Sequence, residues 1–253
     1  MPTFLHRNLT PTSEMDNDIF SIGSAGRVRL TQMLSFKAEY YFALPNQFPD
    51  ANGKKSKYIS RFYTCTSCHS PVKEDPIVSS FDPQVRLDYA EKNGLKFLQG
   101  STFYGIANRE SWYNDDYEKK YGDLVKPARN SLAESTQLCA KICSSGRYLE
   151  DWELEAILAY FWNNQLKIKD LKLSEKELKS IQDEENKREA ISLLKSKFAV
   201  KPPATFGESP QRQDLGFEGI TGDPINGKKV YELSCMSCHQ DGGISGIAFT
   251  NSK

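Results

Sequence analysis

The sequence has little histidine and little methionine, with three and four residues respectively among 253. It also has no excess charge, because 33 basic residues balance 33 acidic ones, so charge gives no reason to expect binding to nucleic acid or to a membrane surface. No run of about 18 apolar residues occurs, which excludes a transmembrane helix in the printed chain. The first twenty residues have no apolar segment typical of a signal peptide.

Two of the three histidines directly follow a Cys-x-x-Cys pair, at residues 65–69 (CTSCH) and 235–239 (CMSCH). This pattern is the attachment motif of c-type haem, in which both thiols form thioethers and the histidine binds the iron. A redox dithiol or a four-cysteine zinc site are the alternatives, but a zinc site has no need of a histidine after each pair. The sequence therefore predicts two covalently bound haem c groups, one at Cys65, Cys68 and His69 and the other at Cys235, Cys238 and His239.

Methionine, the common second axial ligand of c-type iron, is missing from the segment that follows the first motif. The next methionine after His69 is Met236, inside the second motif, and the remaining histidine is His6. Two further cysteines, Cys139 and Cys143, precede a predicted helix near residues 151–162, and a thiolate is a competent iron ligand. A disulfide between them, or two inert thiols, are the alternatives.

A di-haem chain with a distal cysteine resembles the thiosulfate dehydrogenases and the SoxA-type cytochromes of sulfur oxidation. The resemblance rests on residues 60–165 and 222–245, and the spacing to Gly146-Arg147 selects Cys139 over Cys143 as the implied iron ligand. By the same resemblance, Arg109 or Arg129 would lie near an anionic substrate. The alternative for residues 103–129, which we favour, is a solvated loop and helix with aromatic core contacts.

The predicted fold class is all-α, with two cytochrome c-like haem domains. We expect an N-terminal arm of unclear structure over residues 1–50, a first haem domain over 51–170 and a connector over 171–221. The connector combines a helix, which opens with a capping box at Ser174 and Glu177, with a Pro- and Gly-rich linker. The second haem domain, 222–253, is expected to be incomplete, so that either the polypeptide continues or another chain completes it. We expect that a leader was removed or that the chain is a fragment.

The predicted function is electron transfer outside the cytoplasmic membrane, in the periplasm or a similar compartment, with redox proteins as partners. One alternative is an oxidoreductase that oxidises a sulfur anion such as thiosulfate at the haem ligated by histidine and cysteine. The other alternative is a haem subunit of a larger respiratory or photosynthetic complex.

Overall fold

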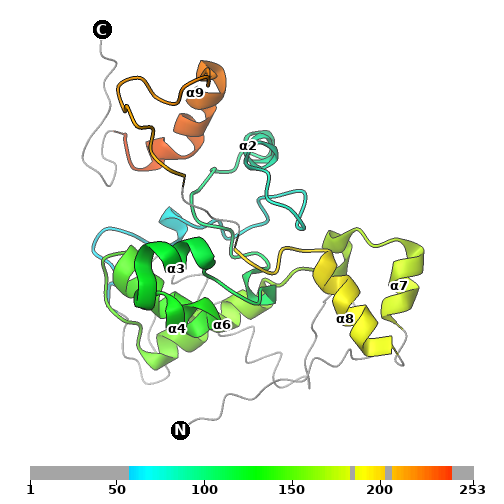
Figure 1. The fold of residues 1–253 in the computed structure, drawn as a ribbon. Helices are drawn as coiled ribbons and strands as arrows, with labels where there is room; N and C mark the ends of the chain where they lie inside the picture. The colour runs from blue at the N-terminus through cyan, green and yellow to red at the C-terminus, as the bar shows by residue number, and fades with distance from the viewer. Residues whose placement is uncertain (1–56, 183–185, 203–206, 241–253) are drawn as a thin grey trace.

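The structure, a computed structural model, describes residues 57–182, 186–202 and 207–240 (Figure 1). The predicted N-terminal arm, His6 and the last residues of the second predicted haem domain lie outside the described residues. The described α-helices are α2 (Pro83–Lys92), α3 (Asp115–Tyr121), α4 (Lys126–Arg129), α5 (Leu132–Leu138), α6 (Asp151–Asn163), α7 (Glu175–Ile181), α8 (Lys187–Ser196) and α9 (Pro224–Leu233). Between them lie 3-10 helices at Cys65–Ser67, Ile106–Asn108, Gly122–Leu124, Ile168–Leu171 and Cys235–Ser237, and a π-helix at Cys139–Cys143.

The main hydrophobic core forms around one face of α6. Ile157 and Phe161 of α6 are almost fully buried and pack with Phe103 and Leu149. Burying a side chain such as Ile157 contributes about 1.5–3 kcal/mol. The helix was predicted from its apolar spacing, and the structure confirms it. Glu153, however, was expected on the polar side of this helix, and it lies in the interior.

Helices α2 and α9 begin with the same Asp-Pro signal. Asp82 accepts hydrogen bonds from the amides of the first turn of α2, and Asp223 does the same for α9. In each helix the next residue is proline, whose fixed φ suits the first helical position. The two helices lie beside each other at one end of the molecule (Figure 1).

Helix α7 opens with the predicted capping box, in which Ser174 and Glu177 bond reciprocally to each other's backbone amide. The predicted connector helix is divided, because α7 ends at Ile181 and α8 begins at Lys187. These two helices pack together to one side of the α6 core (Figure 1). Phe198, which follows α8, joins Leu166 and Leu171 in a second hydrophobic cluster.

Tyr58 and Phe62 stand four residues apart, a spacing that predicts a helix before the first motif with both side chains on one face. Residues 57–64 are not helical, and both aromatic side chains are more than half exposed. This segment is instead held by backbone bonds to the loop before α6, since the Arg147 amide donates to the Ile59 carbonyl at 2.9 Å. A tertiary contact therefore overrides the local helical spacing.

No helix among the described residues combines the length and the hydrophobicity needed to cross a membrane.

Candidate functional site

The two Cys-x-x-Cys-His motifs adopt the same backbone turn. In the first, the amides of Cys68 and His69 both donate to the Cys65 carbonyl, at 3.3 and 3.0 Å. In the second, the amides at positions 238 and 239 both donate to the Cys235 carbonyl, at 3.0 and 2.9 Å. Each turn is a short 3-10 helix that brings its two cysteines and its histidine to one place. Two segments far apart in the sequence therefore carry their two cysteines and histidine on the same backbone turn.

A serine side chain forms a hydrogen bond to the backbone at the start of each turn. Ser67 Oγ accepts from the Thr64 amide at 3.1 Å, and Ser237 Oγ donates to the Ser234 carbonyl at 2.8 Å. Each serine stands directly before the second cysteine of its motif. The spacer residues thus stabilise the turn without occupying the positions of the thiols.

The imidazole of His69 is oriented by its surroundings. Its Nδ1 lies 2.7 Å from the Ser101 carbonyl oxygen, which can only accept, so Nδ1 carries the proton and Nε2 keeps its lone pair. The ring stacks on Phe103, with centroids 5.0 Å apart and planes 18° apart. Burial lowers the pKa of His69, which favours the neutral ring. This is the ligand-ready form of a metal-binding histidine, whose other nitrogen donates to a carbonyl.

Gly100 completes the cradle of His69. A Cβ at this position would lie 2.5 Å from His69 Cε1 and 2.7 Å from the Cys68 carbonyl oxygen. The Gly100 amide in turn donates to that carbonyl at 2.8 Å. Two thiols, an unprotonated Nε2 and a backbone that packs behind the imidazole fit a c-type haem, so Cys65, Cys68 and His69 would hold one.

The thiols of the first motif are protonated at neutral pH. Burial raises the pKa of Cys65 to about 12, and burial, with the charges of Cys238 and Cys143, raises the pKa of Cys68. The second motif therefore lies close enough to the first for the charge of Cys238 to raise the pKa of Cys68. Within the described part of the chain the cysteines form no disulfide, so the predicted alternative of a Cys139–Cys143 disulfide is not what the structure shows.

A single π-helical turn continues α5; it begins at Cys139 and ends at Cys143. Cys139 is half-buried, and its pKa is raised by its hydrogen bond to Cys143 and by burial, with smaller effects from Cys65 and Cys68. Cys143 is exposed, and the hydrogen bond from Cys139, with one from Tyr113, lowers its pKa to about 6. Of the two thiols, Cys143 is thus the thiolate. Both stand beside the first motif, as the sequence predicted for an iron ligand, although the sequence favoured Cys139.

Arg147 forms a clasp between the segment that precedes the first motif and α6. Its guanidinium makes two parallel bonds to Glu153, both at 2.7 Å, and donates to the carbonyls of Lys57 and Tyr58. The preceding residue must be glycine, because a Cβ on Gly146 would lie 2.3 Å from the Ile59 carbonyl oxygen. We call Arg147, Glu153 and the segment 57–59 the Arg147 clasp. It explains why Glu153 is buried, and it gives Gly146-Arg147 a structural role.

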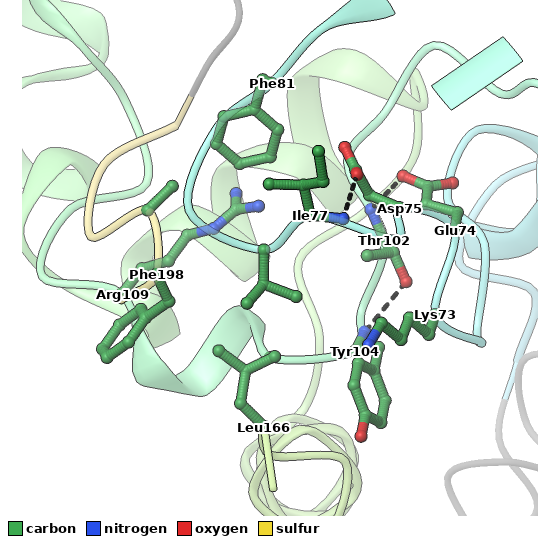
Figure 2. A pocket seen from close by; sticks show the side chains of 13 residues that line it. Lys73, Glu74, Asp75, Ile77, Phe81, Thr102, Tyr104, Arg109, Leu166 and Phe198 are labelled. Carbon is green, nitrogen blue, oxygen red and sulfur yellow. Dashed lines mark hydrogen bonds between the residues drawn. The ribbon is translucent and has the colours of Figure 1, made fainter. Parts of the chain in front are cut away.

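The two arginines proposed as catalytic candidates differ in their environments. Arg129 is partly exposed and pairs with Asp115 and Glu118. Arg109 is buried and donates to Ser101 Oγ at 2.9 Å, and Figure 2 shows its guanidinium among the side chains that line a pocket. The favoured alternative, a solvated loop and helix, therefore fits the surroundings of Arg129 but not those of Arg109. The structure does not bring the two arginines into one site.

Four contributors to the site were missed from the sequence: Gly100, Ser101, Tyr113 and Arg147. Ser101 acts through its backbone carbonyl, a group that every residue carries, so no side-chain signal could have identified it. The sequence pointed only weakly to Gly100 and Arg147. The need for a glycine at position 100 and the buried ion pair of Arg147 both depend on contacts that form only in the tertiary fold. Tyr113 lay in a segment rich in tyrosine, where nothing distinguished it from its neighbours.

Residues 1–63 match the model of a family described as a membrane bound beta barrel domain (DUF5777). The match covers about a quarter of the chain and ends just before Cys65. Comparison with the curated proteins and with the solved structures found no match. The description of the family as membrane bound is compatible with a location outside the cytoplasm.

These findings correct two expectations. The resemblance to thiosulfate dehydrogenases and SoxA-type cytochromes is wrong, because the family that matches is a different one. The classification of the chain as a metal-binding cytochrome c oxidoreductase is also wrong: the matching family is not described in those terms, and the described residues hold no group of three or more His, Cys, Asp or Glu that could bind a metal ion. The physical reason is that a five-residue motif specifies a local turn and not a family.

A covalently attached haem needs fewer side-chain ligands from the protein than a metal ion bound by side chains alone. The porphyrin brings its own nitrogen ligands, so the iron needs only one or two side chains. The described residues hold no cluster of three or more His, Cys, Asp or Glu side chains, and this absence bears only on metal ions that are bound by side chains alone.

Proposed function

We propose that the chain carries two covalently attached haem c groups and transfers electrons outside the cytoplasmic membrane. The observation that carries the proposal is the orientation of His69, whose Nδ1 donates to the Ser101 carbonyl at 2.7 Å beside two protonated thiols. When bound, haem supplies one-electron redox chemistry. The residues of the chain supply its attachment, its axial ligand and a partly buried setting.

The second motif supports a second group through its backbone. Its turn repeats the hydrogen bonds of the first, and α9 positions it against α2. The Phe97 amide donates to the Leu233 carbonyl at 3.0 Å, directly before the second motif. Such close placement of two redox groups suits transfer of electrons between them and on to a redox partner protein.

The second axial ligand of the first iron is proposed to come from Cys139 or Cys143. Both thiols stand beside Cys65 and Cys68, and Cys143 is the one whose thiolate is stabilised, by Cys139 and Tyr113. Low-temperature EPR of the oxidised, haem-loaded protein tests this proposal. Histidine–thiolate iron gives a low-spin spectrum with a compressed spread of g values, and the spectrum should change in Cys143→Ser or in Cys139→Ser, whichever removes the ligand. A spectrum unchanged in both variants would exclude both thiols.

The attachment itself is tested by intact-protein mass spectrometry. The full chain is produced in an oxidising compartment together with haem-attachment enzymes, and its mass is compared with that of the unmodified polypeptide. We expect a gain equal to two haem groups, which falls to one in Cys65→Ala/Cys68→Ala and to one in Cys235→Ala/Cys238→Ala. The matched control, Cys139→Ser/Cys143→Ser, should keep both groups because neither thiol belongs to a motif. A folded wild-type chain with no added mass would refute the proposal.

The proposed location, in the periplasm or another extracytoplasmic compartment, follows from the attachment chemistry. Thioether formation belongs to proteins matured outside the cytoplasm, and the membrane-bound description of the matching family agrees with such a place. Redox proteins, or a larger electron-transfer assembly, are the proposed partners.

A further inference from the structure

Arg109 is a buried cation that forms no ion pair with any carboxylate of the described residues. It follows the 3-10 helix Ile106–Asn108, is 9% exposed, and donates from one guanidinium nitrogen to Ser101 Oγ at 2.9 Å. Within the described residues it forms no ion pair with a carboxylate, unlike Arg147 or Arg129. Burial lowers the pKa of Arg109 to about 10, and the more distant Glu74 only partly opposes this. A buried charge without a partner is costly, so its presence calls for an explanation.

The guanidinium faces a small cavity. The cavity has a volume of about 40 Å³, room for about three water molecules or a group of similar size. Its wall beside Arg109 is apolar and is formed by Ile77, Val78, Phe81, Leu166 and Phe198 (Figure 2). The Arg109 Cζ atom lies 5.7 Å from the centre of the Phe81 ring. A cation beside apolar walls suits a ligand with a negative head and a short apolar body.

The acidic residues of the cavity are engaged elsewhere. Glu74 Oε1 accepts from the Thr102 amide at 2.8 Å and lies 3.3 Å from Arg86 Nε, while Asp75 Oδ1 accepts from the Ile77 amide at 2.7 Å. Their other carboxylate oxygens are buried and accept no hydrogen bond from the part of the chain that the structure describes. Burial raises the pKa of both carboxyls, which favours their neutral forms. Figure 2 shows both carboxyls on the side of the cavity away from Leu166 and Phe198.

Lys73, the other cation of the lining, does not compete for an anion. Its ammonium group pairs with Asp170 at 2.9 Å. The positive charge of Arg109 is therefore available in this cavity to pair with an anion.

We propose that Arg109 and this cavity bind a carboxylate attached to a short apolar chain. Two sources present that chemistry: a free short-chain carboxylic acid, and a carboxylate side chain of a haem attached at the first motif. Ser101 joins the two places, because its carbonyl accepts from His69 Nδ1 and its hydroxyl accepts from Arg109. Only the second source rests on the proposed function.

The first experiment uses the full chain produced without haem attachment. Sodium propionate is titrated in, with propionamide as the neutral probe of the same size, and binding is followed by isothermal titration calorimetry and saturation-transfer NMR. For the free-acid source we expect propionate to bind, propionamide not to bind, and Arg109→Gln to lose at least tenfold in affinity. Arg129→Gln is the matched control and should bind as the wild type does. The comparison of the two probes on the wild type decides the need for charge even if Arg109→Gln fails to fold.

The second experiment uses the haem-loaded protein. Resonance Raman spectra report the bending modes of the haem carboxylates, and for the haem source these modes should shift in Arg109→Gln and stay unchanged in Arg129→Gln. The proposal is overturned if propionate does not bind, or binds no better than propionamide, and the haem carboxylate modes are also unmoved. If no haem attaches, the proposed function fails and the first experiment alone decides this proposal, so the two failures are distinguishable.

Discussion

Gly100 shows how a single position controls the orientation of the first imidazole. Its missing side chain leaves the space that the His69 ring and the Cys68 carbonyl occupy. His69 is thereby held with Nδ1 on the Ser101 carbonyl and Nε2 open. A residue outside the motif thus helps to set the orientation of the histidine within it.

Gly100→Ala should destabilise the chain by about 1–3 kcal/mol, because the added Cβ would meet His69 and Cys68 atoms at 2.5–2.7 Å. Urea unfolding measures the loss. Gly227→Ala, at a helical glycine whose Cβ would meet nothing within 4 Å, is the control and should be neutral or slightly stabilising. Under haem-attachment conditions, Gly100→Ala should also lose the haem of the first motif selectively. Equal stability of the two variants would contradict this account.

Cys143 should be the most rapidly alkylated thiol of the unloaded chain. Alkylation requires the thiolate, and the pKa of Cys143 is lowered to about 6 by hydrogen bonds from Cys139 and Tyr113. The rate should therefore be nearly constant above pH 7 and fall as the pH drops through 6, while Cys139, whose pKa is raised, stays slow. Peptide mapping after iodoacetamide treatment at a series of pH values measures both thiols.

Tyr113→Phe tests the origin of this reactivity. Loss of the phenol O–H removes one of the bonds that stabilise the thiolate, so the midpoint of the alkylation profile should move to higher pH. Tyr148→Phe, an exposed tyrosine, provides the control. An unchanged midpoint in Tyr113→Phe would assign the lowered pKa to Cys139 alone.

Helix α6 depends on a charge that its amphipathic pattern would place in solvent. Glu153 is almost fully buried, and Arg147 compensates it with two hydrogen bonds while also holding the carbonyls of Lys57 and Tyr58. Buried pairs of this kind contribute little net stability when complete but are costly to break. The Arg147 clasp thus fixes the segment before the first motif to the core.

Arg147→Ala should cost about 3–5 kcal/mol in the free energy of unfolding, because it removes the arginine that pairs with the buried Glu153 carboxylate. The double variant Arg147→Met/Glu153→Leu should recover most of this loss, since no buried charge remains. Denaturant unfolding gives both values, and Arg129→Ala, whose ion pairs are solvent-exposed, should have no measurable effect. A double variant as unstable as the single one would show that the carbonyl contacts, and not the charge, dominate.

The elements that the sequence predicted are those encoded locally. The apolar spacing of residues 151–162 and the Ser174–Glu177 capping box each lie within a few residues, and the structure has both. The helix expected before Cys65 and the exposed position of Glu153 were wrong because both depend on Arg147, which no local pattern connects to them. The cavity beside Arg109 was missed because its walls come from segments that are far apart in the sequence.

At the scale of the whole molecule, contacts between α2 and α9 hold the two motifs together. Gln84 and Asn226 exchange side-chain hydrogen bonds near the helix N-termini, Lys229 pairs with Glu91, and the Phe97 amide donates to Leu233. Most of these contacts are polar and exposed. The association of the second motif with the rest of the molecule should therefore be weak and sensitive to salt.

Lys229→Glu should loosen this contact, because it places two acidic groups together, and adding Glu91→Lys should restore it. Hydrogen exchange at the Phe97 amide is the readout, since that amide bonds across the contact. We expect faster exchange in the single variant, a rate near that of the wild type in the charge-swapped pair, and faster exchange of the wild type at high salt. An exchange rate indifferent to all three changes would show that the ion pair does not hold the contact.

The family match on residues 1–63 could not be predicted from the two motifs. Each Cys-x-x-Cys-His turn is stabilised by its own short-range bonds, so it forms the same way in unrelated surroundings. The match to a membrane-bound domain falls on residues 1–63, ahead of both motifs.

The Arg147 clasp also sets an order of events during synthesis. Tyr58 and Arg147 are 89 residues apart, so the first motif leaves the ribosome well before its anchor exists. At about 5–20 residues per second, roughly 4–18 s pass before the arginine follows. During that interval the segment that precedes Cys65 has no arginine to bind, and only afterwards can the Arg147 clasp fix this segment to the core.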